Sequence, residues 1–128
     1  MSFPRSLLLA SLALAGMLAG CRTVRPPDPR ISLDPGIRRK VHVTQFIVHR
    51  NAADLVEIQA TLSNPGSRTL PLETRVDWFD LEGLKQESLT AKWSSLSISG
   101  HTEYSLKVTA PNEAATDFRC YIRESRRN

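Results

Sequence analysis

The stretch Val56-Glu57-Ile58-Gln59-Ala60-Thr61-Leu62-Ser63 alternates strictly between apolar and polar side chains. Successive side chains of a β-strand point to opposite faces, so this pattern predicts a strand with one face on a core and the other in solvent. Asn64-Pro65-Gly66-Ser67 follows directly, and these residue types favour a turn. The stretch therefore indicates a fold built from short strands joined by tight turns.

Other segments carry similar strand patterns. Predicted strands cover residues 41–48, 56–63, 72–79, 104–109 and 118–122. Residues 84–96 are less regular and hold one broken strand around 89–93. Because no segment shows a convincing helical period, we predict an all-β fold, an antiparallel immunoglobulin-like β-sandwich of about six to seven strands. The aromatic residues predicted to fill its core are Trp78, Phe79, Trp93, Tyr104 and Phe118.

The first residues of the chain are typical of a bacterial signal peptide. A short positive region and an apolar run lead to the box Leu18-Ala19-Gly20-Cys21, and the run is too short to cross a bilayer comfortably. This box is that of bacterial lipoproteins, in which the cysteine thiolate attacks an activated lipid. We predict a signal peptide over residues 1–20, cleavage between Gly20 and Cys21, and lipidation of Cys21. The alternative is an ordinary secretory signal with a chance cysteine.

A segment rich in proline and arginine follows the predicted anchor. Proline interrupts regular structure and favours an extended chain, so we predict a tether over residues 21–40 and a sandwich domain over 41–128. The basic side chains of the tether either contact anionic lipid or are simply solvated. Arg22, rather than aspartate, follows Cys21, which favours the outer membrane, facing the periplasm, over retention at the inner membrane.

The chain has two cysteines, Cys21 and Cys120. Lipidation of Cys21 leaves Cys120 alone in the mature chain, although an oxidising periplasm would otherwise permit a disulfide. Cys120 alternates in phase with Phe118 and Ile122, so we predict a buried, apolar cysteine in preference to a reactive thiol.

Several short stretches resemble one family of small bacterial lipoproteins. They are Thr61-Leu62-Ser63-Asn64, the run from Arg75 to Gly83, Trp93, Val108-Thr109-Ala110-Pro111 and Phe118-Arg119. Together they resemble the YcfL-like family, over roughly residues 41–123, with the element Trp78-Phe79-Asp80 and Gly83 as the most specific part. The resemblance implies a β-sandwich in the bacterial envelope and no known activity.

The Trp78-Phe79-Asp80-x-x-Gly83 element also has a structural interpretation. Trp78 is expected to point into the core, Asp80 to accept backbone N–H bonds across a turn, and Gly83 to adopt a positive φ. We favour this role over ligand binding.

Groups for catalysis or metal binding are sparse in this chain. His42, His49 and His101 are the only histidines, and a regular strand would place His42 and His49 on opposite faces. We find no metal-ligand spacing, no nucleophile elbow and no phosphate-binding glycine loop. We therefore predict no cofactor, no metal site and no catalytic residues.

These observations predict a non-catalytic, lipid-anchored periplasmic interaction module. Its partners would be the membrane, through the anchor, and an envelope protein or the cell wall, whereas nucleic acid is excluded by the predicted compartment. One alternative is an accessory subunit of an envelope machine, such as a secretion apparatus or an activator of a cell-wall synthase. A small periplasmic hydrolase is a further, less favoured alternative.

Overall fold

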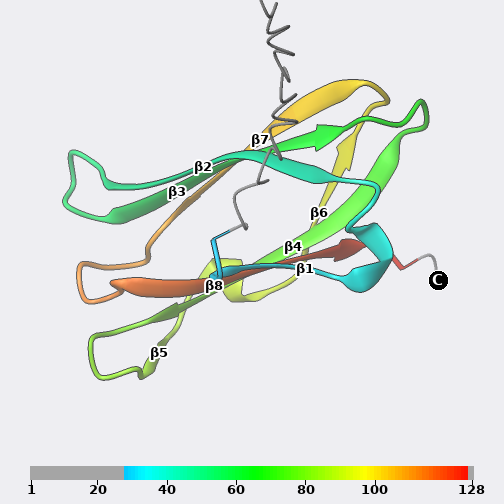
Figure 1. Ribbon diagram of the computed structural model, residues 1–128. Coiled ribbons are helices and arrows are strands. Elements are labelled where there is room, and N and C mark those ends of the chain that lie inside the picture. Colours follow the sequence, from blue (N-terminus) through cyan, green and yellow to red (C-terminus); the bar gives the residue numbers. More distant parts are fainter. Residues whose placement is uncertain (1–27, 127–128) are drawn as a thin grey trace, which may run out of the picture.

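The computed structural model describes residues 28–126, and these residues form two β-sheets that pack face to face (Figure 1). One sheet has the strand order β1-β8-β4-β5, with β6 also paired to β4, and the other has the order β2-β3-β7. The prediction of an all-β sandwich is confirmed. The elements are β1 (Ile31–Leu33), η1 (Pro35–Ile37), β2 (His42–Arg50), β3 (Val56–Asn64), β4 (Leu70–Phe79), β5 (Lys85–Gln86), η2 (Leu89–Ala91), β6 (Ser94–Ile98), β7 (Thr102–Thr109) and β8 (Asp117–Glu124).

The core lies between the sheets and follows the alternation of the sequence. In β3, Ile58, Ala60 and Leu62 are buried, as the apolar phase of the strand predicts. They face an apolar row from the opposite sheet, which includes Trp78 and Phe118 with ring centroids 5.7 Å apart. Burial of these two aromatic residues provides a large share of the apolar area removed from water.

The tether was predicted to end at residue 40 and the sandwich to begin at residue 41. For residues 28–40, which the structure describes, this boundary is wrong. Residues 31–33 form strand β1, which pairs with β8 in parallel, so the sandwich is not purely antiparallel. Ile31 and Ile37 are buried in the core cluster. Burial of these two isoleucines removes apolar area from water, which is why this segment packs on the sandwich although prolines surround it. The folded domain therefore includes residues 31–37, which the prediction had assigned to the tether.

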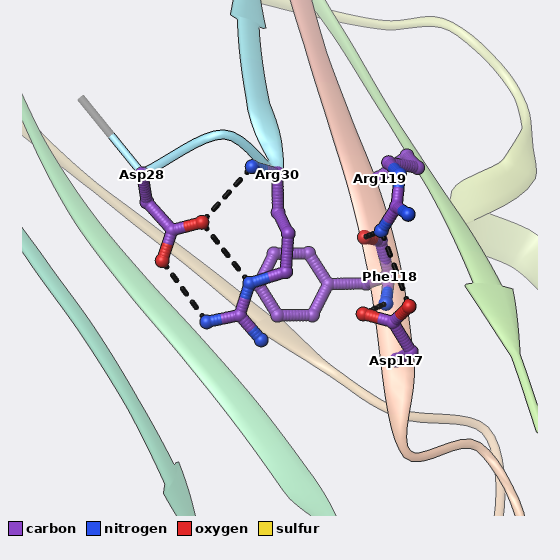
Figure 2. A network of polar contacts seen from close by, with 5 residues as sticks. All are labelled: Asp28, Arg30, Asp117, Phe118 and Arg119. Carbon is purple, nitrogen blue, oxygen red and sulfur yellow. Dashed lines mark hydrogen bonds and ion pairs between the residues drawn. The ribbon is translucent and has the colours of Figure 1, made fainter. Parts of the chain in front are cut away.

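The first described residues are held by contacts around Arg30 (Figure 2). The Arg30 guanidinium lies 4.5 Å from the centroid of the Phe118 ring. Its Nε and Nη2 donate to the Asp28 carboxylate at 3.0 and 2.9 Å. The Arg30 carbonyl accepts a hydrogen bond from the Cys120 amide at 2.8 Å. The chain is thus attached to β8 as soon as the described part begins.

The predicted aromatic core is only partly correct. Trp78 and Phe118 are fully buried, and Phe79 is half-buried outside the core cluster. Trp93 is 36% exposed and Tyr104 is 37% exposed. Tyr104 points to the same side as Leu62, but it lies on the edge strand β7, so its side chain stays partly exposed.

Candidate functional site

The Trp78-Phe79-Asp80 and Gly83 element has a structural role. The indole N–H of Trp78 donates to the Thr90 hydroxyl at 3.1 Å, and that hydroxyl donates to the Val76 carbonyl at 3.1 Å. The buried indole therefore has the hydrogen-bond partner that it requires. Thr90 belongs to η2, so this contact also fastens η2 to β4.

The turn after β4 has the geometry that the sequence indicates. One Asp80 carboxylate oxygen accepts hydrogen bonds from the backbone amides of Glu82 at 3.0 Å and Leu84 at 2.8 Å. Gly83 has φ of +82°, which a residue with a side chain rarely adopts. These hydrogen bonds fix the indole and the turn, so they give the element a structural role.

Of the two cysteines, only Cys120 lies among the described residues. Gly20 and Cys21, the predicted cleavage and lipidation residues, lie outside the described residues. Cys120 is buried, and burial raises the pKa of its thiol to about 12. A thiol of that pKa has almost no thiolate at neutral pH, so Cys120 is an unreactive core residue, as predicted.

A different set of side chains gathers on the outer face of the sheet that contains β4 and β8. We call Trp93, Tyr121, Arg75 and Arg123 the aromatic–arginine face. Tyr121 of β8 lies directly opposite Arg75 of β4, and Arg123 lies opposite Glu73. Residues opposite each other in neighbouring strands share a face, and the buried residues between them point the other way. The four side chains therefore lie on one outer surface.

Arg123 is held over the Trp93 ring. Its guanidinium carbon lies 3.7 Å from the ring centroid, and its Nε donates to a Glu73 carboxylate oxygen at 2.8 Å. Trp93 and Tyr121 are each 36% exposed. The guanidinium thus has one fixed orientation, and both aromatic rings keep surface available for contact with a partner.

Arg75 is fixed in a similar way. Its Nε and Nη2 donate to the two oxygens of Asp77 at 3.0 and 2.8 Å, and Lys85 lies 3.3 Å from the same carboxylate. Burial raises the pKa of Asp77, but the hydrogen bonds from Arg75 and Lys85 outweigh this effect and hold the pKa below its ordinary value. Asp77 therefore stays ionised at neutral pH and keeps Arg75 in place.

A shallow hollow of about 220 Å³ lies beside these residues. Trp93, Tyr121 and Arg123 line one part of it, and Ser32 and Asp34, from the segment around β1, line another. Its lining therefore combines aromatic surface with cations, a carboxylate and a hydroxyl, which are groups that form contacts in protein interfaces. Among residues 28–126, no group of three or more His, Cys, Asp or Glu side chains is arranged to hold a metal ion.

His42 and His49 lie on one surface rather than on two. His42 is opposite Ser63 and His49 is opposite Glu57, both on the outer side of β3. A β-bulge between Val43 and Gln45 adds one residue to β2, which reverses the expected alternation. His49 Nε2 lies 3.3 Å from Glu57 Oε1, and Lys107 lies 3.3 Å from the same oxygen.

The sequence pattern indicates the outer face for both Trp93 and Tyr121, so the prediction of Trp93 in the core was wrong. Trp93 is in phase with Ser95 and Ser97, whereas Leu96 and Ile98 have the opposite phase. Tyr121 is likewise out of phase with Cys120 and Ile122. Two-residue periodicity therefore places both aromatic side chains on the outer face.

The part of the chain that the structure describes holds no helix long and apolar enough to cross a membrane. The fold is a small all-β sandwich that carries two exposed aromatic rings beside two half-buried arginines on one outer surface. The family described as "Protein of unknown function (DUF1425)" matches residues 32–124, and this chain belongs to that family.

Two solved structures share the fold. The crystal structure of Campylobacter jejuni cj0090 has a TM-score of 0.66 and 23% sequence identity, covering 77% of this chain and 100% of that one. A DUF1425 family member from Shewanella sp. pv-4 has a TM-score of 0.58 and 23% identity, covering 69% and 81% of the two chains. A comparison with curated proteins gave no significant match.

Proposed function

We propose that this protein is a non-catalytic, lipid-anchored interaction module of the bacterial envelope, and that its aromatic–arginine face binds an envelope protein. One observation carries the proposal: Trp93 and Tyr121 are exposed on one face of a rigid sheet, beside a half-buried Arg123 that is fixed between Trp93 and Glu73. Tryptophan, tyrosine and arginine are the residue types that dominate the binding energy of protein interfaces. Their fixed orientation lowers the entropy lost on binding.

The proposal of a lipid anchor rests on the box that ends at Cys21 and on the apolar run before it. The absence of aspartate after Cys21 supports the outer membrane, with the module facing the periplasm. The narrower assignment to the YcfL-like lipoproteins within the family is part of the same proposal, and the cell wall is the second partner that it allows.

Replacement of the anchoring cysteine tests the first part of the proposal. Cys21→Ser removes the only sulfur that the lipid could use in the box, so the protein should appear in the soluble periplasmic fraction or stay uncleaved. Cys120→Ser is the matched control and should fractionate like the wild type. Identical fractionation and migration of Cys21→Ser and wild type would contradict lipid anchoring.

Chemical crosslinking in intact envelopes tests the binding part. A discrete adduct of the wild type should be lost in Arg123→Ala, because the guanidinium and its support of Trp93 are both removed. Lys92→Ala, an exposed neighbour outside the face, should retain the adduct. Equal adducts from all three proteins would exclude this face as the interface.

A second candidate is an accessory subunit of an envelope machine, and the edge of β7 favours it. β7 pairs with β3 along eight consecutive residue pairs and pairs with no other strand among the described residues. A regular, open edge can accept a strand from a neighbouring protein. A photo-crosslinking residue at Ser105 would report such a neighbour, and no adduct from that position would count against this candidate.

A further inference from the structure

A larger hollow lies at one end of the sandwich, apart from the aromatic–arginine face. Its volume is about 780 Å³. Three segments form it: Arg39 and Lys40 before β2, residues 64–71 from the end of β3 to the start of β4, and Glu124 at the end of β8 with Ser125 after it. Figure 1 shows that η1 and the C-terminal end of β8 lie at this same end. A hollow of this size accommodates a small ligand or a lipid headgroup.

The charge of this hollow is positive. Arg39, Lys40 and Arg68 line it together with a single carboxylate, Glu124. Glu124 is engaged by Lys40, whose Nζ lies 3.0 Å from Oε2. Within residues 28–126, no carboxylate lies within 4.0 Å of the Arg39 or Arg68 guanidinium. Arg39 and Arg68 therefore line the hollow without an ion-pair partner among the described residues.

The loop that carries Arg68 is held rigidly by Asn64, which is 3% exposed. The Asn64 side-chain amide donates to the carbonyls of Arg68 at 2.8 Å and Ile98 at 2.9 Å, and its oxygen accepts from the Gly66 amide at 3.0 Å. A Cβ on Gly100 would lie 2.2 Å from the Ser67 carbonyl oxygen, so the neighbouring loop packs directly against this one. The backbone on which Arg68 stands is thus fixed before any ligand arrives.

We propose that this hollow is an anion site that binds a phosphate-bearing group through Arg39 and Arg68. Guanidinium groups match phosphate oxygens with paired hydrogen bonds, and a fixed loop lowers the entropy lost on binding. Lys40 stands beside them as a third cation that can leave Glu124 for the phosphate. The group belongs either to an anionic lipid headgroup or to a soluble phosphorylated compound. This site does not depend on the proposed protein partner.

The test uses the chain from Arg22 to Asn128, which contains the whole described domain. Inorganic pyrophosphate is titrated in one arm, and vesicles of phosphatidylglycerol are compared with vesicles of phosphatidylcholine in the other. Binding to pyrophosphate supports a soluble ligand, whereas binding to phosphatidylglycerol vesicles alone supports a headgroup. The amide signals of residues 64–69 should shift on binding. Failure of both probes to bind overturns the proposal.

Two arginine variants and a matched control localise the site. Arg68→Ala and Arg39→Ala should each weaken binding by about tenfold or more, since each removes a charged hydrogen-bonding group. Lys92→Ala removes the same charge from an exposed position outside the hollow and should leave affinity unchanged. The Arg68 side chain has no hydrogen bond within the described residues, so Arg68→Ala should leave the fold intact. Arg39→Ala tests the same site independently from a different segment. Equal weakening by Lys92→Ala would show unspecific attraction and overturn the site.

Discussion

Trp78 and Trp93 are the two tryptophans of the chain, and their environments are opposite. Trp78 is fully buried against Phe118, with its indole N–H bonded to Thr90. Trp93 has more than a third of its surface exposed and carries a guanidinium on its ring. At the residue scale, the same side chain therefore belongs to the core at one position and to an exposed cation–π pair at the other.

The two tryptophans should differ in their contribution to stability. Trp78→Ala leaves a large cavity and should lower the free energy of unfolding by about 3–5 kcal/mol. Trp93→Ala removes one exposed cation–π contact and should lower it by about 1 kcal/mol or less. Urea unfolding of both variants checks this. Similar losses for the two would place Trp93 in the core and remove the basis of the binding face.

The pH dependence of the free energy of unfolding tests the contact between Asp28 and Arg30. The hydrogen bond from Arg30 lowers the pKa of Asp28 below its ordinary value of 3.8, against the smaller effect of burial, which raises it. The folded pKa is thus below the unfolded one, so the stabilisation is complete above about pH 4 and is lost as pH falls through the folded value.

Asp28→Asn should therefore be less stable than wild type at pH 7, and the difference should shrink below about pH 4. Urea unfolding of both proteins across this range measures it. Equal stability at pH 7 would mean that the Asp28–Arg30 pair contributes nothing in solution, and a pH-independent difference would point to a cause other than the carboxylate charge.

At the scale of elements, short-range features changed what periodicity alone implied. One extra residue in β2 brought His42 and His49 to the same surface. Strand β1 has only three residues, yet it pairs with β8 and precedes η1, where Ile37 is fully buried. A segment this short carries too few alternations for the sequence pattern to reveal it.

Removal of β1 and η1 should destabilise the sandwich. A chain that starts at residue 41 loses Ile31 and Ile37, whose burial contributes about 3–6 kcal/mol together, and it uncovers the edge of β8. Its melting temperature should fall by about 10 °C or more relative to the chain from residue 22. Equal melting temperatures would restore the prediction of a tether up to residue 40.

The sequence predicted the sandwich because most strands are long enough to show alternation, as in residues 56–63. It also predicted the Asp80 turn, since both its hydrogen bonds and its positive φ depend on local residue types. The aromatic–arginine face was not predicted, because it depends on the register between β4 and β8, which brings together residues about 50 positions apart. The basic hollow likewise joins three distant segments.

At the scale of the whole molecule, the packing of residues 31–37 on the sandwich shortens the proposed tether. If Cys21 carries the anchor, the chain from Cys21 to Asp28 spans at most about 25 Å when fully extended, at roughly 3.3–3.6 Å per residue. The sandwich would then stay close to the membrane. Its partners would be proteins near the membrane surface, which agrees with a headgroup as one source of the phosphate proposed for the basic hollow.

The central claim is that the aromatic–arginine face binds an envelope partner, and site-specific photo-crosslinking in intact cells tests it most directly. A photoreactive residue at Ser95, which lies opposite Glu73 on this face, should give a discrete adduct. The adduct should disappear when Trp93→Ala or Arg123→Ala is added. A probe at Gln59, on the outer side of the other sheet, should give none. An adduct from Gln59 but not from Ser95, or one from Ser95 that both substitutions leave intact, would contradict the account.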